Sequence, residues 1–334
     1  MITLAEIIER DKRPPSVTVS MTCYNHAKYL DEAIRGVLMQ KTNFPVNIVI
    51  HDDASPDGSA EIIRRYASEN PNITAIIEET NYYQNGKSFF PKVLPHLTGK
   101  YIAYCECDDF WIDENKLQIQ VDYLEANPDC SMVCSNTLPV NKYSQYDESC
   151  RSPWNPKKEE GDYPKGYLFG IKNQLASFLL RNFWQFMTLE EIDFYIHVKA
   201  NGDGKLLAIC LGLGRVHYLS QELAAYRHIT DEGDSYSALR AKKTKYEFYC
   251  FFSCQEMERY RLVEHFFGKR YYRKYLWLLF RELKGCIKFR RTVIKDANLT
   301  HYYKEIPWCV WLYFPFYVSY KALRKIVKIL LRIK

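Results

Sequence analysis

The stretch Tyr101-Ile-Ala-Tyr-Cys-Glu-Cys-Asp-Asp-Phe-Trp111 joins a short apolar run to a cluster of acids. Its first part, residues 101–105, predicts a buried strand because it is apolar almost throughout. Its second part places Glu106, Asp108 and Asp109 within four residues, where the carboxylates repel each other unless a cation lies among them. Hard oxygen ligands suit Mg²⁺ or Mn²⁺, with substrate phosphates and water completing the coordination shell. A solvated surface loop is the alternative for the same acids.

Similar apolar runs on both sides of this stretch also predict strands, namely residues 17–21, 46–50, 73–77 and 131–135. Between these runs, apolar residues recur at helical spacing over residues 29–38, 62–66 and 117–124. Strands that alternate with helices predict an α/β fold, Rossmann-like, with a mostly parallel central sheet flanked by helices. In such sheets ligands bind beyond the carboxyl ends of the strands, which is where the acids lie.

The segments that follow the first two predicted strands are also polar. No GxGxxG motif follows the first strand, which runs into Thr22-Cys23-Tyr24-Asn25, and this argues against a dinucleotide-binding loop. The second strand ends in Asp52-Asp53-Ala54-Ser55-Pro56-Asp57-Gly58-Ser59. Its carboxylates suit hydrogen bonds from a base or a ribose, and a plain turn with a helix cap at Ser59 is the alternative.

Three later segments carry further candidate residues. Asn85-Gly86-Lys87-Ser88 resembles the end of a P-loop, but Asn81 stands where the first glycine is required, which leaves Lys87 as a single phosphate contact. Asp203 lies between two glycines, where it suits a general base or only a turn. Tyr226-Arg227-His228 brings an Arg and a His together, as a diphosphate site or as ordinary surface.

Taken in this order, the segments resemble family 2 glycosyltransferases of the GT-A fold, which occur in bacterial capsule, exopolysaccharide and lipopolysaccharide assembly. The resemblance covers about residues 15–230: residues 52–59 are similar to the family's uridine-binding stretch and residues 106–109 to its metal-binding DxD. It implies a metal-dependent, inverting enzyme that moves a hexose or N-acetylhexosamine from a UDP-sugar to a glycan. That acceptor is expected to be lipid-linked, in cell-surface polysaccharide synthesis.

The resemblance also implies roles for single residues. The uracil and ribose are expected to contact Thr22, Tyr24, Asn25 and Asp53. The sugar diphosphate and its Mn²⁺ or Mg²⁺ are expected at Asp108 and Asp109, with Asp203 as the base. The residues expected to close over the donor are Tyr226, Arg227 and His228. Glu106 departs from the usual first acid of DxD and is expected to face the donor.

Two other classes of protein stay open at this point. A sugar nucleotidyltransferase shares a related α/β fold, but the Gly-rich, Arg-containing loop that holds a triphosphate is missing after the first strand. A non-catalytic subunit that binds a sugar or a nucleotide is the second alternative. An acidic cluster together with Asp203 argues against it, since a binding subunit needs no base.

Charge divides the chain into two parts. Residues 1–234 carry a net −10 and residues 235–334 a net +16. We therefore expect a GT-A catalytic domain over 1–234, with nucleotide-sugar binding in 15–135 and the acceptor and base in 136–234. Residues 235–334 are expected to form a basic helical region that meets a polyanion. The acids near the N-terminus are wrong for a signal peptide, and 11 cysteines without a CxxC pair fit a reducing cytoplasm.

The C-terminal segment has the composition of a membrane-surface helix. Residues 306–320 are mostly apolar, but Pro307 and Pro315 interrupt them and the run is too short to span a bilayer. Basic side chains then share one face at helical spacing, namely Lys321, Arg324, Lys325, Lys328 and Arg332. We expect this segment to bind an anionic membrane, on the inner face of the bacterial plasma membrane, and to bind no nucleic acid. A helix docked on the protein is the alternative.

Overall fold

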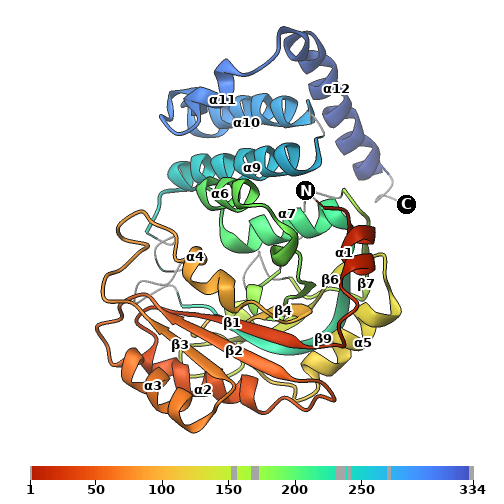
Figure 1. Ribbon diagram of the computed structural model, residues 1–334. Coiled ribbons are helices and arrows are strands. Elements are labelled where there is room, and N and C mark those ends of the chain that lie inside the picture. Colours follow the sequence, from red (N-terminus) through yellow and green to blue (C-terminus); the bar gives the residue numbers. More distant parts are fainter. Residues whose placement is uncertain are drawn as a thin grey trace. The chain divides into compact units, whose positions relative to one another are not determined.

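The computed structural model describes residues 2–151, 156–166, 173–229, 238, 242–268 and 272–330, and side chains in the last helix as far as Arg324. The chain forms two compact units (Figure 1). The sheet unit comprises Met1–His197 and Leu206–Ala238, and the helical unit comprises Val198–Lys205 and Leu239–Lys334. The compact units therefore group residues 198–205 with the C-terminal helices, and a domain boundary at residue 234 stays a proposal.

In the described part of the sheet unit, nine strands form one sheet in the order β3-β2-β1-β4-β8-β6-β9-β5, with β7 paired to β9. The strands are β1 (Val17–Cys23), β2 (Val46–Asp52), β3 (Ile73–Ile77), β4 (Tyr101–Tyr104), β5 (Phe110–Trp111), β6 (Cys130–Val140), β7 (Gly161–Tyr163), β8 (Leu179–Arg181) and β9 (Arg215–Arg227). With the helices on its faces this is the predicted α/β architecture.

The half of the sheet formed by β3, β2, β1 and β4 is parallel, as predicted. Val17 lies opposite Val46 on one side and opposite Tyr101 on the other, so the three strands begin in register. Buried parallel strands are apolar on both faces, which is why these runs could be recognised in the sequence. Their carboxyl ends meet at one edge, where the predicted donor residues follow.

The other half of the sheet is mixed, and the sequence patterns did not predict most of it. β8 is antiparallel to β4 and to β6, β9 is parallel to β6, and β5 is antiparallel to β9. β6 continues to Val140, so this strand extends beyond the predicted run of residues 131–135. The register of β6 and β9 shifts between Cys130 and Met132 and on both sides of Asn136, and such bulges break the alternation that marks a strand in the sequence.

Helices cover the sheet at positions that the apolar spacing predicted. The helices of this part of the chain are α1 (Leu4–Arg10), α2 (Ala27–Leu38), α3 (Ser59–Glu69), α4 (Phe90–Val93), α5 (Lys116–Ala126), α6 (Leu189–His197) and α7 (Gly202–Leu213), with short 3₁₀ turns η1 (Leu94–His96), η2 (Glu148–Cys150), η3 (Leu175–Ser177) and η4 (Trp184–Phe186). α1 begins at a capping box, in which Thr3 and Glu6 each bind the other's backbone N–H, and it ends before Pro14-Pro15.

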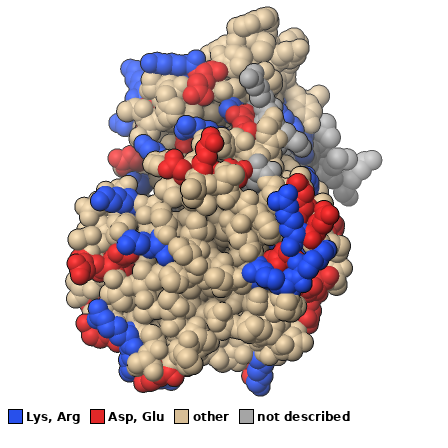
Figure 2. All heavy atoms as spheres, viewed as in Figure 1, with Lys and Arg blue, Asp and Glu red and all other residues tan. Residues whose placement is uncertain are grey.

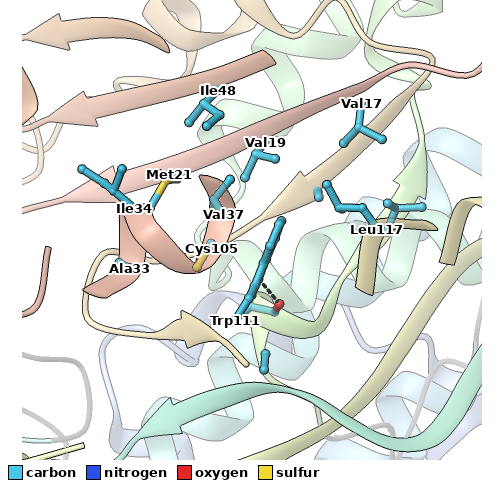
Figure 3. Close-up of a cluster of buried hydrophobic side chains, with 14 of the residues drawn as sticks. Val17, Val19, Met21, Ala33, Ile34, Val37, Ile48, Cys105, Trp111 and Leu117 are labelled. Carbon is cyan, nitrogen blue, oxygen red and sulfur yellow. Dashed lines mark hydrogen bonds between the residues drawn. The ribbon is translucent and has the colours of Figure 1, made fainter. Parts of the chain in front are cut away.

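The main core lies between α2, α3 and α5 and one face of the parallel strands. Figure 3 shows Ile34 and Val37 of α2 turned toward Met21 and Val19 of β1, and all four are buried. Gly36 allows α2 to approach the backbone of Trp111 closely, because a Cβ atom at this position would lie 2.8 Å from the carbonyl oxygen of Trp111. The core therefore fixes the segment that begins with the acids and ends at Trp111.

The helical unit has a smaller core of its own. It contains α9 (Lys245–Phe267), α10 (Arg273–Phe289), η5 (Val293–Lys295), α11 (Thr300–Lys304) and α12 (Trp308–Leu330). Thr244 and Glu247 form a capping box at the start of α9, and Gly268 ends it in the left-handed conformation. The sequence suggested that Pro315 interrupts this segment, but α12 continues through Pro315 as one helix. No helix in the described ranges is long and apolar enough to cross a membrane.

Candidate functional site

The loops after β1 and β2 are joined by hydrogen bonds. Asn25 adopts a left-handed backbone with φ of 58°, and its N–H donates to Ser55 Oγ at 3.0 Å. The Ser55 hydroxyl in turn donates to the carboxylate of Asp52. Asn25 Oδ1 is buried and accepts no hydrogen bond from any described residue. This amide oxygen is therefore ready for a donor from a ligand. Thr22 and Tyr24 lie beside it and are partly exposed.

Asp53 organises the loop that follows β3. Its carboxylate is buried and accepts N–H groups from Tyr82 at 2.7 Å and Tyr83 at 3.1 Å. Its backbone carbonyl accepts from Asn81 Nδ2 at 3.0 Å. The same loop carries Lys87, which is exposed. Asp53 thus holds the loop that carries Lys87, the predicted phosphate contact.

The acidic segment continues from β4 and then forms a turn, in which the N–H of Asp109 donates to the carbonyl of Glu106 at 3.0 Å. The N–H of Cys105 donates to the carbonyl of Ser20 at 3.1 Å, and the N–H of Cys107 donates to the carbonyl of Thr22 at 3.1 Å. Both cysteines are buried in this segment, whereas Glu106 and Asp108 are partly exposed. Two carboxylates of the acidic segment are therefore accessible to a ligand.

His26 lies next to this segment and was not among the predicted site residues. Its Nε2 is 3.8 Å from Asp108 Oδ2, and its Nδ1 is buried without a hydrogen-bond partner in the described part of the chain. The sequence held one signal, because His26 directly follows the predicted Thr22–Asn25 segment.

Asp109 is buried, with a side chain only 2% exposed, and half of its carboxylate is unused. Oδ1 accepts the backbone N–H of Arg227 at 2.9 Å, whereas Oδ2 finds no hydrogen-bond partner among the described residues. Burial, together with the charges of Asp108 and Glu106, raises the pKa of this carboxyl well above its usual range. A buried oxygen without a partner beside a partly exposed carboxylate fits a hard divalent cation.

These two acids do not make a complete metal cage. Within the described ranges, no three His, Cys, Asp or Glu side chains converge as a metal-binding group. A cation held at Asp108 and Asp109 would need its remaining ligands from phosphate and water, which is the habit of Mg²⁺ in phosphate-binding sites.

Arg227 lies inside the fold, where its guanidinium holds the acidic segment in place. Its side chain is 1% exposed and pairs with Glu32 at 2.7 Å. It donates to the backbone carbonyl of Asp108 at 2.8 Å and lies 4.2 Å above the ring of Tyr29. Because strand residues alternate, its neighbours Tyr226 and His228 are partly exposed, with ring centroids 6.0 Å apart. The three predicted donor contacts therefore divide into one buried and two accessible side chains.

Asp203 belongs to the helical unit and lies in the first turn of α7. The glycines around it are part of this helix and do not form the simple turn that was the alternative. Its carboxylate accepts the N–H of Gly204 at 2.7 Å and a hydrogen bond from Asn201 Nδ2. Burial raises its pKa, and the Gly204 hydrogen bond and the charge of Arg259 oppose that rise. A carboxyl with a raised pKa is a stronger proton acceptor than an ordinary aspartate.

Side chains of α9 hold the segment around Asp203. Gln255 Oε1 accepts the N–H of Asn201 at 2.6 Å, and Glu258 Oε2 accepts the N–H of Lys199 at 3.0 Å. A Cβ atom on Gly204 would lie 3.1 Å from Arg259 Cδ, so this backbone and the Arg259 side chain pack closely. The predicted base is thus fixed by the basic C-terminal helices.

The sequence of the sheet unit identifies the family. Residues 18–181 match the glycosyl transferase family 2 model. This matched region belongs to glycosyl transferase family 2. The match contains the three loops just described, up to the end of β8, and confirms the resemblance seen in the sequence.

Curated relatives match shorter stretches of the chain. Rv1520 of Mycobacterium tuberculosis is 40% identical over 118 residues, which is 35% of this chain and 33% of the relative. The glycosyltransferase alr2836 of Nostoc is 33% identical over 111 residues, or 33% of each chain. The chain thus spans about a third of the length of these curated relatives.

A solved structure shows the same fold. The crystal structure of Staphylococcus aureus TarS 1-349 in complex with UDP-GlcNAc superposes with a TM-score of 0.55 at 15% identity, covering 88% of this chain and 82% of that one. Together with the family match, this establishes the GT-A fold with a helical C-terminal region.

Proposed function

We propose that the protein transfers a hexose or an N-acetylhexosamine from a UDP-sugar to a glycan acceptor, with inversion at the anomeric carbon. The observation that carries this proposal is the pair formed by partly exposed Asp108 and by Asp109, whose buried Oδ2 accepts no hydrogen bond from the described residues. TarS binds UDP-GlcNAc in its crystal structure, which supports a UDP-sugar as the donor.

We assign the cation to these two acids. Asp108 and Asp109 would hold Mn²⁺ or Mg²⁺, which when bound neutralises negative charge on the diphosphate leaving group. Arg227 would hold the acidic segment in place, because its guanidinium donates to the carbonyl of Asp108 and its backbone N–H donates to the carboxylate of Asp109. We therefore revise its expected role from a donor contact to a positioning residue, because its guanidinium is buried among protein partners.

The nucleoside would be held by the loops after β1 and β2. Asn25 Oδ1 supplies a buried acceptor, and Thr22 and Tyr24 border it with partly exposed side chains. Asp53 already binds two backbone N–H groups, so it contributes to uracil and ribose binding by holding its loop as well as by any contact of its own. Lys87 on that loop is free to approach phosphate because it is exposed.

The sugar end of the donor would meet the accessible side chains around the acids. Glu106 and Asp108 carry the partly exposed carboxylates of the acidic segment, and Tyr226 and His228 lie at the end of β9. Asp203 would take the proton from the acceptor hydroxyl as that oxygen attacks the anomeric carbon and the bond to the diphosphate breaks. Its raised pKa favours proton uptake.

We further propose that the acceptor is a lipid-linked glycan in cell-surface polysaccharide synthesis. The reaction would then occur on the cytoplasmic face of a membrane. The basic charge of residues 235–334 supports this location, because the lipid surface on that side is anionic.

Release of UDP from a panel of UDP-sugars, with Mn²⁺ and with EDTA, tests the transferase proposal. We expect slow hydrolysis of one UDP-sugar that needs the cation and is lost in Asp108→Asn. The matched control is Asp122→Asn, which makes the same change on the exposed side of α5. Formation of UDP-sugar from UTP and a sugar phosphate would instead indicate a nucleotidyltransferase. Binding of a UDP-sugar without consumption, also in the presence of glycan acceptors, would indicate a non-catalytic subunit.

A further inference from the structure

α12 carries a row of exposed apolar side chains along its outer face. Trp308, Leu312, Phe316 and Tyr320 recur at every fourth residue and Leu323 follows, with exposed fractions of 76%, 62%, 74%, 56% and 61%. Residues at this spacing lie on one face of a helix. The surface over the first turns of α12 is correspondingly uncharged in Figure 2.

The opposite face of α12 packs on the helical unit. Val310 is 3% exposed and belongs to the core of that unit, and Phe314 packs against the same core. Tyr317 meets Phe280 of α10 edge to face, with ring centroids 5.9 Å apart. The helix is therefore held by its inner side, and the exposed row is not needed for this packing.

An exposed row of this size needs an explanation. Single exposed apolar residues are normal on protein surfaces, but contiguous apolar patches mark sites that bind a partner or a membrane. Trp311 at 51% and Tyr313 at 66% exposed widen the row on its two sides. Leaving such side chains in water forgoes about 1.5–3 kcal/mol for each large one that burial would recover.

The chemistry of the row and of its surroundings fits a lipid surface. Trp and Tyr, with an apolar body and a polar edge, are favoured at the boundary between lipid and water. Arg324, at the end of the described side chains, is exposed, and residues 235–334 carry a net +16. The side chains of Lys325, Lys328 and Arg332, which the sequence placed on one basic face, lie outside the described residues.

We propose that the outer face of α12 lies in the surface of an anionic lipid bilayer, with Trp308, Leu312, Phe316, Tyr320 and Leu323 inserted among the acyl chains. Amphipathic helices bind in this way by combining apolar burial with attraction to anionic headgroups. Because no helix in the described ranges can cross a bilayer, the segment acts as a surface anchor there. This inference is independent of the proposed sugar transfer.

Flotation of the full chain with lipid vesicles tests the proposal. Mixed phosphatidylcholine and phosphatidylglycerol vesicles are expected to bind the wild type, and phosphatidylcholine vesicles to bind it more weakly. The double variant Leu312→Ser/Phe316→Ser is expected to lose affinity by about tenfold or more, since both side chains leave the lipid. The matched control is Tyr143→Ser/Leu189→Ser, which removes side chains that are 70% and 86% exposed in the sheet unit and should bind like the wild type.

A second variant tests the electrostatic part. Arg324→Gln should weaken binding to the anionic vesicles by about fivefold and leave binding to neutral vesicles unchanged. Blue-shifted tryptophan fluorescence on binding, reduced in Trp308→Ser/Trp311→Ser, would report insertion directly. Unchanged melting temperatures in all variants would show that the exposed positions do not contribute to folding.

Several results would overturn the proposal. One is equal vesicle binding by the α12 variant and its control. Another is a wild type that ignores vesicles and forms a dimer that Leu312→Ser/Phe316→Ser dissociates, since the row would then be an interface between two copies. Salt-sensitive binding to nucleic acid without vesicle binding would assign the charge to another partner. UDP-sugar hydrolysis in solution should be unchanged in the α12 variant, so failure of the anchor and failure of the transferase proposal are distinguishable.

Discussion

Two segments of the chain place a carboxylate wholly or partly out of water, and the dominant charges around it act on its pKa in opposite directions. In residues 105–109, the charges of Asp108 and Glu106 add to the effect of burial on the pKa of Asp109. In residues 198–205, the charge of Arg259 opposes the effect of burial on Asp203. Arg227 offsets only part of the negative charge in the first segment, so a bound cation would relieve the repulsion there, whereas the second segment has Arg259 of α9 beside its carboxylate. This difference is what we expect between a cation-binding acid and a proton-accepting acid.

The largest expected effect concerns Asp203, the proposed proton acceptor. Asp203→Asn keeps the size of the side chain but removes the base, so transfer should fall by about 10²–10⁴ while UDP-sugar affinity is unchanged. Product formation at saturating donor and calorimetric donor titration would measure the two quantities. Asp193→Asn, at a side chain 73% exposed on α6, is the matched control. Turnover close to normal in Asp203→Asn would assign the base to another residue.

The next largest effect concerns Asp109, a proposed cation ligand. Asp109→Asn can still accept the Arg227 N–H but offers a neutral oxygen to the cation. Loss of a group that only supports a metal ligand typically lowers metal affinity by about 10–100-fold. We expect the affinity for Mn²⁺ in the presence of UDP to fall by at least this much. Paramagnetic resonance of free Mn²⁺ gives this affinity without an activity assay, with Asp122→Asn as control. Equal Mn²⁺ affinity in both variants would remove Asp109 from the cation site.

Arg227→Met should break the support of the acidic segment. The variant loses charged hydrogen bonds to Glu32 and to the Asp108 carbonyl, so the free energy of unfolding should drop by about 2 kcal/mol. Urea unfolding measures this drop. Arg35→Met removes an ion pair with Asp31 whose Arg side chain is 72% exposed, and it should cost less than about 1 kcal/mol. Comparable losses in the two variants would contradict a supporting role for Arg227.

The smallest effect is a shift in pH dependence. Arg259→Gln removes the charge that lowers the pKa of Asp203, so this pKa should rise and the acid limb of the rate profile should move to higher pH. Other charged groups of this segment and of α9, among them Lys199, Lys205, Glu256 and Glu258, stay in place. Arg261→Gln, on the same helix with a side chain 58% exposed, is the control. If the acid limb does not move, Arg259 does not control the pKa of the base.

The parallel half of the sheet could be predicted because each of its strands is an almost continuous apolar run. Most of the mixed half could not, since only residues 131–135 of β6 were predicted there. β8 has three residues, and the polar residues Ser220, Gln221 and Glu222 interrupt the pattern of β9 near its bulge. Pairing between such strands is decided by the finished sheet, which local composition does not reveal.

The same limit applies to the site. Asp53, Asp108 and Asp109 were found because they follow buried strands, and this placement is local. Which way Arg227 points depends on its position in β9, a strand that the sequence patterns missed, so its buried side chain was unexpected. His26 was missed because its contact with Asp108 joins loops 82 residues apart.

The hydrogen bond from Arg227 to Asp109 joins residues that are 118 positions apart. A chain emerging from the ribosome can pair β1, β2, β3 and β4 before β9 has been made. Contacts over such long separations also form slowly, because the loop between them must close first. We therefore expect the acidic segment to be completed late in synthesis, so that only chains that have assembled the second half of the sheet offer the proposed cation site.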